Sequence, residues 1–182
     1  MRSSIRIIAL LAVAGCASTA DPNDRNVTPE RVMIGRDGYQ VADVTITRED
    51  YVPDTRLPTS RAALWALLPS VYDEVGLPAP SVDEATWTVL VQNHGVMRTL
   101  GGQRMSSLLE CGRGMTGAYA DTHRIRLTVR TWLEAAGSST DVKTRVVAEA
   151  SSVEGTAGTI ACSSRGQLEA RIAAALKEAA AR

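Results

Sequence analysis

The sequence predicts an α+β fold, a curved antiparallel sheet with helices packed on one face. Residues 124–131 and 142–149 alternate apolar and polar side chains, which is typical of half-buried strands. The segment 61–75 and the C-terminal segment instead repeat apolar residues at intervals of three and four, as amphipathic helices do. With the other predicted elements, the order is β-β-α-β-(short α)-β-β-α, which favours a sheet with helices on one face.

The first half of the domain contains two strands, a loop and a helix. Residues 31–34 and 39–47 are predicted strands around the turn 35–38, and residues 48–58 are a predicted loop. Thr59 or Ser60 is expected to cap the helix 61–75, and Gly76 is expected to end it. Pro69 lies inside this helix and is expected to kink it, or to split it near Leu68.

The second half begins with a predicted strand at 85–91, a loop at 93–103 and a short helix at 104–110. The last helix is expected to start from Ser163 or Ser164, with Gln167 completing a capping box. The apolar stripe predicted for this helix consists of Leu168, Ile172, Ala175, Leu176 and Ala179. Glu169, Arg171, Lys177 and Glu178 are expected on its solvent side.

The N-terminus has the features of a secretory signal peptide. Arg2 and Arg6 precede an apolar core that is too short to cross a bilayer, since a spanning helix needs roughly 20 apolar residues. The sequence Val13-Ala14-Gly15-Cys16 resembles the lipobox of bacterial lipoproteins. Two alternatives remain: an ordinary signal peptide with a chance cysteine, and a cytoplasmic protein with a hydrophobic first helix.

The lipobox resemblance implies that residues 1–15 are removed and that Cys16 carries the lipid, with palmitate-like acyl chains holding the protein to the membrane. Residues 16–29 are then the lipidated cysteine and a flexible tether, and residues 30–182 form a single α+β domain. Because Ala17 rather than aspartate follows the cysteine, the resemblance implies the periplasmic face of the outer membrane within the cell envelope.

The order of elements over residues 58–182 is similar to the helix-grip domains of outer-membrane assembly lipoproteins of the BamC kind. This similarity is in element order and includes no diagnostic motif, so it implies a fold and no function.

Once Cys16 is assigned to the lipid, Cys111 and Cys162 remain, and an even pair in an oxidising compartment favours a disulfide. If paired residue numbers in the hairpin add up to 273, Leu127 lies opposite Val146 and both face the core. The same register places Cys111 opposite Cys162.

The polar face of this hairpin is the predicted surface for an anionic partner. The 273 register places Arg130 opposite Lys143, and like charges directly opposed destabilise a strand pair. The candidate surface consists of Arg124, Arg126, Arg130, Trp132, Lys143 and Arg145. Lipid headgroups, a cell-wall polymer or an acidic patch on a partner protein would neutralise it, and the alternative is that the side chains extend into water.

The net charge and the short motifs of the sequence argue against several classes of function. The chain has 20 Lys and Arg and 20 Asp and Glu, so loss of Arg2 and Arg6 leaves a mature net charge of about −2, which gives no general affinity for nucleic acid. Residues 112–117 (GRGMTG) match a phosphate-binding glycine pattern, but a flexible bend beside the disulfide explains them better, because a strand and not a helix is expected to follow. No metal or cofactor site is predicted.

The sequence therefore predicts a non-catalytic, membrane-anchored docking lipoprotein. The first alternative is a carrier of a small apolar ligand between helix and sheet. The second is an envelope hydrolase, for which His94 and His123 are the residues to consider. With Asp121 they were also considered as zinc ligands, but a zinc site needs more ligands than these three offer.

Overall fold

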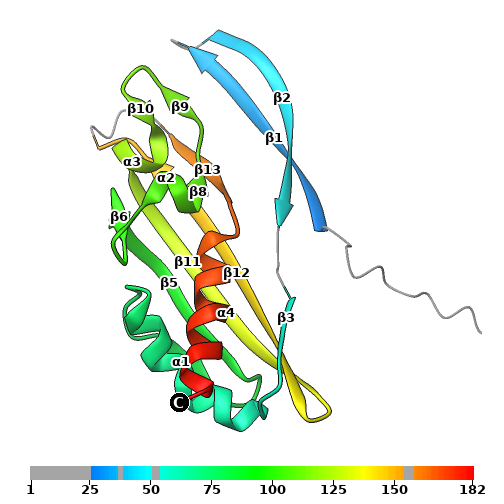
Figure 1. The fold of residues 1–182 in the computed structure, drawn as a ribbon. Coiled ribbons are helices and arrows are strands. Elements are labelled where there is room, and N and C mark those ends of the chain that lie inside the picture. The colour runs from blue at the N-terminus through cyan, green and yellow to red at the C-terminus, as the bar shows by residue number, and fades with distance from the viewer. Residues whose placement is uncertain (1–25, 37–38, 51–53, 154–157) are drawn as a thin grey trace, which may run out of the picture.

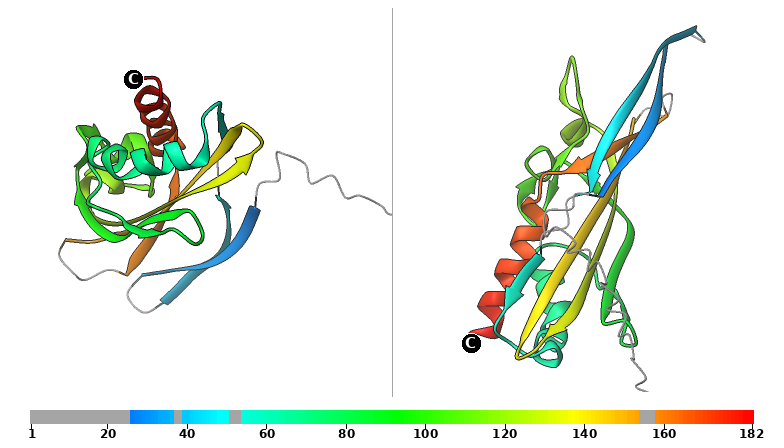
Figure 2. Two further views of the ribbon diagram at one scale, coloured as in Figure 1. Left: turned by 90° about the horizontal axis from the view of Figure 1, so that it is seen from below. Right: turned by 90° about the vertical axis from the view of Figure 1, so that its right-hand side faces the viewer.

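The computed structural model describes residues 26–36, 39–50, 54–153 and 158–182. A seven-stranded antiparallel sheet has the strand order β4-β5-β11-β12-β13-β8, with β3 also paired to β12. These strands are β3 (Asp54–Leu57), β4 (Ser81–Asp83), β5 (Thr88–Met97), β8 (Leu109–Glu110), β11 (Arg124–Ala136), β12 (Ser139–Ser151) and β13 (Thr159–Ser164). Helices α1 (Arg61–Glu74) and α4 (Gln167–Ala180) pack on one face of this sheet (Figures 1 and 2). The predicted α+β class is confirmed.

Three further hairpins, of which β1–β2 is long and the other two are short, and two short helices complete the described fold. The hairpins are β1 (Asn26–Arg36) with β2 (Tyr39–Asp50), β6 (Thr99–Leu100) with β7 (Gln103–Arg104), and β9 (Arg113–Gly114) with β10 (Gly117–Ala118). The short helices are α2 (Met105–Leu108) and α3 (Tyr119–Thr122). β1 begins within the segment 16–29 that was predicted as a tether. Cys16 and the signal segment lie outside the described residues.

Strand β5 differs from its prediction at both ends. It begins at Thr88 rather than at 85 and continues to Met97, so the predicted loop 93–103 is wrong over its first five residues. The cause is an irregularity: Asn93 has a φ of 53°, and the pairing with β11 shifts between Leu127 and Val129. An extra residue in a strand interrupts the two-residue alternation, so the pattern no longer indicated a strand.

Among the strands that the sequence did not predict, β3 and β13 are the longest. β3 occupies part of the predicted loop 48–58 and pairs with the first residues of β12, with Leu57 opposite Thr140. β13 lies between β12 and α4. The predicted direct connection from the hairpin to the last helix is therefore wrong. Both strands are short, with four and six residues, and neither has a clear alternation of apolar residues.

The long hairpin has the predicted faces but a different register. β11 and β12 are joined by a two-residue turn, with Ala136 opposite Ser139, so Leu127 lies opposite Ala148 and not Val146. The predicted pairing is wrong by two residues. A shift of two keeps every side chain on its own face, since alternate residues point the same way. The apolar pattern therefore predicted the buried face correctly, and the turn decides the register.

Cys111 and Cys162 form the predicted disulfide, with a sulfur–sulfur distance of 2.05 Å. The reason given for the pairing was wrong, because neither cysteine belongs to an extension of the β11–β12 hairpin. Cys111 directly follows β8 and Cys162 lies in β13; these strands pair with Glu110 opposite Ser163. The bond therefore fastens the edge strand β8 to the sheet.

Helix α1 is capped and ended as the sequence predicts. The Ser60 hydroxyl accepts a hydrogen bond from the Ala63 amide at 3.3 Å. At the other end, the amides of Gly76 and Leu77 donate to the carbonyls of Asp73 and Tyr72, a Schellman arrangement with Gly76 at a φ of 85°. Pro69 stays within one continuous helix, so the split expected near Leu68 does not occur.

The core between the helices and the sheet contains a chain of three buried hydroxyl groups. Tyr72 of α1 donates to Thr131 of β11 at 2.9 Å, and Thr131 shares a hydrogen bond with Thr144 of β12 at 2.9 Å. All three side chains are buried. Each buried hydroxyl thus has a partner, which avoids the cost of an unsatisfied polar group.

Helix α4 begins differently from its prediction. Its N-cap is Gly166, with no side-chain cap, so neither Ser163 nor Ser164 has the predicted capping role. Glu169 was expected on the solvent side but is 1% exposed. It lies three residues before Ile172 and seven before Leu176, which places it on the buried stripe of the helix.

Candidate functional site

The predicted anionic-partner surface lies on the outer face of β11 and β12, as expected, and some of its charges are paired within the protein. Lys143 forms an ion pair with Glu134 at 2.7 Å, and the indole of Trp132 donates to the same carboxylate at 3.0 Å. Arg126 lies 3.5 Å from Glu149. Lys143 and Arg126 of the predicted surface therefore have acidic partners within the protein.

The contact between Lys143 and Glu134 shifts the pKa of both groups. The hydrogen bond from Lys143 lowers the pKa of Glu134, despite partial burial that acts to raise it. The same hydrogen bond raises the pKa of Lys143. Both groups are therefore charged at neutral pH, and the pair contributes no net charge to the surface.

The like charges that face each other across the β11–β12 hairpin belong to a different pair of residues from the predicted pair. The two-residue shift in register places Arg130 opposite Arg145, whereas Lys143 lies opposite Trp132. The guanidinium of Arg130 turns toward the Trp132 ring, 5.4 Å from its centroid, which gives it a favourable cation–π contact. The predicted repulsion between Arg130 and Lys143 is therefore absent.

A different basic region lies at the end of the molecule formed by β6–β7, α2, the β9–β10 hairpin and α3. Three neighbouring hollows of about 570, 380 and 590 Å³ open there, and Arg104 lines all three. We call this region the arginine-rich end and define it by the arginines that line the hollows. These are Arg98, Arg104, Arg113 and Arg165.

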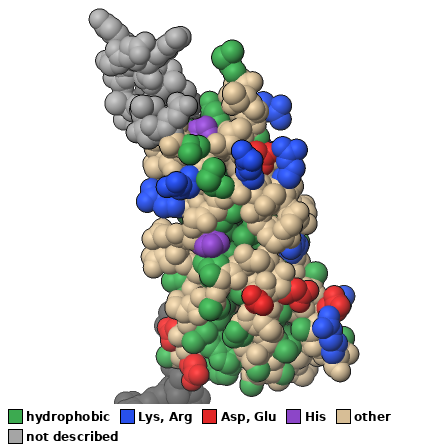
Figure 3. All heavy atoms as spheres, turned by 90° about the vertical axis from the view of Figure 1, so that its left-hand side faces the viewer, with side chains coloured by type: hydrophobic (Ala, Val, Ile, Leu, Met, Phe, Trp, Pro, Cys, Tyr) green, Lys and Arg blue, Asp and Glu red, His purple; other side chains and the backbone are tan. Residues whose placement is uncertain are grey.

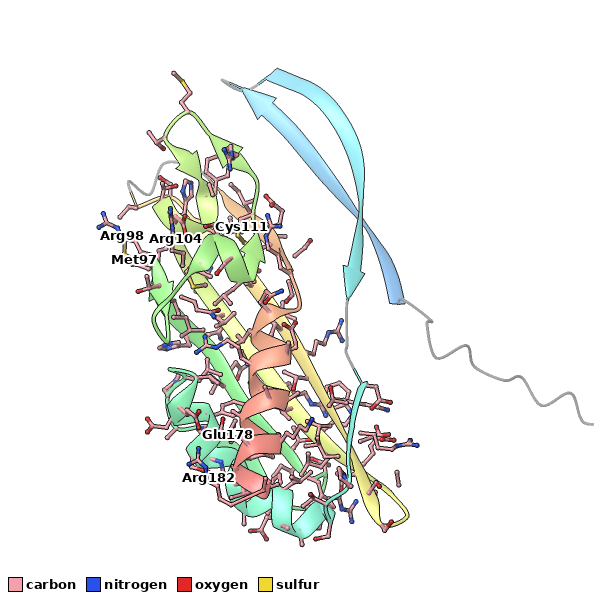
Figure 4. All side chains as sticks on the ribbon, viewed as in Figure 1. Met97, Arg98, Arg104, Cys111, Glu178 and Arg182 are labelled. Atoms are coloured by element: carbon pink, nitrogen blue, oxygen red, sulfur yellow. A yellow bond between two sulfur atoms is a disulfide. The ribbon has the colours of Figure 1, made fainter. Side chains whose placement is uncertain are left out.

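Charge is unevenly distributed along one face of the molecule. On the face seen in Figure 3, Lys and Arg side chains gather toward the upper end, and most Asp and Glu side chains toward the lower end. Figure 4 labels Arg98 and Arg104 at the upper end, and Glu178 and Arg182 at the lower end. The arginine-rich end is therefore one pole of the domain.

Arg104 is fixed at the centre of this end by Asp121. Its guanidinium lies 2.6 Å from the Asp121 carboxylate, which also accepts a hydrogen bond from the Ser106 amide at 2.9 Å. Burial acts to raise the pKa of Asp121, but the hydrogen bonds from Ser106 and Arg104 outweigh it and lower the pKa. Asp121 is thus a permanently charged anchor for Arg104 and the start of α2.

The other arginines of this end divide into paired and unpaired. Arg165 forms an ion pair with Glu110, which also accepts a hydrogen bond from the Gly112 amide. Arg98 and Arg113 are exposed and have no acidic partner among the residues that the structure describes. Their two positive charges are left to face outward.

The glycine-rich segment 112–117 forms the β9–β10 hairpin rather than a phosphate-binding loop. A four-residue helix follows it, too short for the helix N-terminus that holds phosphate in such loops. The bend has a packing reason, because a Cβ on Gly114 would lie 2.6 Å from the Tyr119 ring. Met115, at the tip of this hairpin, is fully exposed.

The two histidines considered for hydrolysis, and Asp121 considered with them for zinc, lie apart from one another in their hydrogen bonding. Asp121 is bonded to Arg104 and Ser106, and the His123 ring nitrogen lies 3.1 Å from the Thr122 hydroxyl. His94 lies on β5 opposite Leu127. No hydrogen bond joins these histidines to each other or to Asp121 within the described structure.

The described residues contain neither a metal-binding cluster nor a helix that could span a membrane. No cluster of three or more His, Cys, Asp or Glu side chains has the arrangement that holds a metal ion. In the same residues, no helix combines the length and apolar composition that crossing a bilayer requires.

The interface between helices and sheet bears on the carrier alternative. Leu64, Leu68, Tyr72, Ile172 and Leu176 are fully buried there. Side chains of the protein thus occupy the region in which a small apolar ligand was expected, and no feature of the core favours that alternative.

Comparisons with known proteins found no matching family model, no matching curated protein and no matching solved structure. The function must therefore be argued from the site itself.

Sequence reasoning missed the arginine-rich end. Its residues come from three separate segments between positions 98 and 165, each in a connection without periodicity. The one signal in the sequence was Met115 within the glycine-rich segment 112–117. A large apolar residue in such a turn is exposed to solvent and could have indicated a contact surface nearby.

Proposed function

We propose that this protein is a non-catalytic, lipid-anchored envelope lipoprotein whose folded domain docks onto an anionic component of the envelope through the arginine-rich end. The anchor rests on the lipobox resemblance at Cys16. The docking rests on one observation, that Arg98 and Arg113 are exposed cations without an acidic partner in the described structure, at the pole where the basic side chains gather.

Electrostatics supports this end over the outer sheet face. An arginine already paired with a carboxylate gains little from a second anion, whereas an unpaired one gains a charge-assisted hydrogen bond. Arg104 is held in place by Asp121, so its remaining guanidinium donors are preorganised toward the hollows. Of the predicted surface, Arg124 adjoins this end, because it lies opposite Met97 of β5.

The anchor is tested by replacing Cys16 with serine in the full chain. Loss of the acylated cysteine should release the protein from washed membranes, since acyl chains provide the membrane affinity. Fractionation and mass measurement of the mature product check this. A native product that retains Met1, or that remains membrane-bound after Cys16→Ser, would contradict the anchor.

Docking is tested by purifying the full chain from cross-linked, gently solubilised membranes. The variant Arg98→Gln with Arg113→Gln removes two charges from the arginine-rich end. The matched control, Lys177→Gln with Arg182→Gln, removes two charges from the far end of α4. We expect an anionic component to be recovered with the wild type and the control, and to be lost with the first variant.

Rising salt should weaken the recovery, because exposed charges are screened over a Debye length of about 8 Å at physiological ionic strength. Equal recovery by both double variants would overturn the assignment of docking to this end. If the wild type recovers no protein, polymer or anionic lipid above background, docking itself is overturned.

A further inference from the structure

Exposed apolar side chains lie beside the arginine-rich end. Large hydrophobic residues exposed in the described structure are Val82, Met97, Met115, Val147 and Val153. Met97 and Val153 line the same hollow as Arg98 and Arg104, and so does Thr116, the neighbour of Met115. Exposed methionine and valine side chains thus adjoin the arginines at one pole of the domain.

The geometry of the hairpin makes Met115 the outermost of these side chains. The β9–β10 hairpin projects beyond the end of the main sheet (Figure 1), and Met115 lies in its turn, fully exposed to solvent. Gly112 and Gly117 have φ angles of 84° and 121°, which suit glycine and allow the tight hairpin. Arg113 lies two residues from Met115, on the same hairpin.

An apolar hairpin tip beside several arginines matches the interface of a bilayer better than an acidic protein patch. A protein surface of acidic residues would leave Met115 and Met97 without an apolar partner. A bilayer with anionic headgroups offers both at once, since phosphates lie at the surface and acyl chains lie directly beneath them.

We propose that the arginine-rich end binds the surface of a bilayer containing anionic phospholipid, with Met115 entering the acyl region and with Arg98 and Arg113 contacting phosphate groups. This rests on the proposed function and specifies its partner as a lipid surface. Arg124 lies opposite Met97 in the β5–β11 pairing and extends the row of cations at the same end. The contact is a second one, separate from the lipid on Cys16.

The test reads the environment of position 115 itself. In the full chain with Cys16→Ser, the change Met115→Cys supplies a single free thiol, because Cys111 and Cys162 are joined. A polarity-sensitive fluorophore on this thiol is measured in vesicles of phosphatidylcholine alone and of phosphatidylcholine with phosphatidylglycerol. The matched control is the same label on Val82→Cys, an exposed apolar position on β4 beside the opposite end of β5.

We expect the emission from position 115 to shift to the blue in the anionic vesicles and to be quenched by lipids brominated on their acyl chains. The label at position 82 should remain in water. Adding Arg98→Gln and Arg113→Gln should lower the inserted-to-free ratio roughly thirtyfold, since each arginine near an anionic surface contributes about 1 kcal/mol.

The remaining outcomes distinguish a failure of the bilayer inference from a failure of the proposed docking. A label at 115 that stays in water, or one that inserts equally without phosphatidylglycerol, overturns the bilayer inference. If the label stays in water but Arg98→Gln with Arg113→Gln still abolishes recovery of a partner, docking holds and its partner is a protein or a polymer. If the arginine changes affect neither measurement, both proposals fall.

Discussion

The Ser164 hydroxyl donates a hydrogen bond of 2.6 Å to Oε1 of Glu169, a carboxylate that is 1% exposed. The second oxygen, Oε2, has no hydrogen-bond partner among the described residues. Burial raises the pKa of Glu169, and the hydrogen bond from Ser164 offsets only part of this. The start of α4 therefore contains a carboxyl group whose neutral form fits the folded state better than its charged form.

We expect this group to make stability depend on pH. Because the folded pKa is raised, the folded state binds the proton more tightly than the unfolded chain does. The protonated carboxyl therefore stabilises the fold below the unfolded pKa, and that contribution is lost as pH rises through the folded pKa. Glu169→Gln should raise the free energy of unfolding at neutral pH and flatten its pH dependence, measured by urea denaturation.

The control for this prediction is Glu178→Gln, on the exposed side of the same helix. It should leave the pH dependence unchanged apart from the loss of its ion pair with Arg182. A variant Glu169→Gln that is less stable than the wild type at neutral pH would show that the carboxylate is satisfied in its charged form.

The disulfide between Cys111 and Cys162 should account for a large part of the stability. It closes a loop with a sequence separation of 51, for which the chain-entropy relation gives about 4 kcal/mol. Reduction, or Cys111→Ser with Cys162→Ser, should lower the free energy of unfolding by about this amount. Guanidinium denaturation of oxidised and reduced protein measures it, and equal midpoints would contradict the prediction.

The hydrogen bond between Tyr72 and Thr131 joins α1 to the centre of the sheet. Tyr72→Phe removes the donor and should cost about 1 kcal/mol, the usual net value of such a bond. Tyr119→Phe is the matched control, since its side chain is only half-buried and should change stability by less than about 0.5 kcal/mol. A double-mutant cycle with Thr131→Val isolates the pair, and a coupling of zero would show that the bond contributes nothing.

Gly101 and Gly102 both have positive φ angles, but only Gly101 lies close to the backbone at the end of α1. A Cβ on Gly101 would lie 2.2 Å from the Val75 carbonyl oxygen, whereas one on Gly102 would meet nothing within 4 Å. Both have positive φ, so alanine at either position should cost about 1–2 kcal/mol from backbone strain. Gly101→Ala should cost about 1–3 kcal/mol more, because the end of α1 must move away. Thermal denaturation of the two variants measures this difference, and equal losses would refute it.

The sequence by itself determined the faces of the two long strands and the position of the two main helices. Alternation along 124–131 and 142–149 predicted the buried and exposed sides correctly, and a spacing of three and four predicted α1 and α4. These features follow from local geometry, because the direction of each side chain depends on its place in a strand or helix. Cys111 and Cys162 were likewise paired correctly from the sequence.

Only the tertiary structure decided which residues meet. The register of the hairpin follows from its two-residue turn, since a shift of two leaves the apolar pattern unchanged. Glu169 is buried because the side of α4 that it shares with Ile172 packs against the sheet. Arg98, Arg104, Arg113 and Arg165 lie together because the fold brings their separate connections to one end. Such contacts join residues distant in sequence, and no local pattern specifies them.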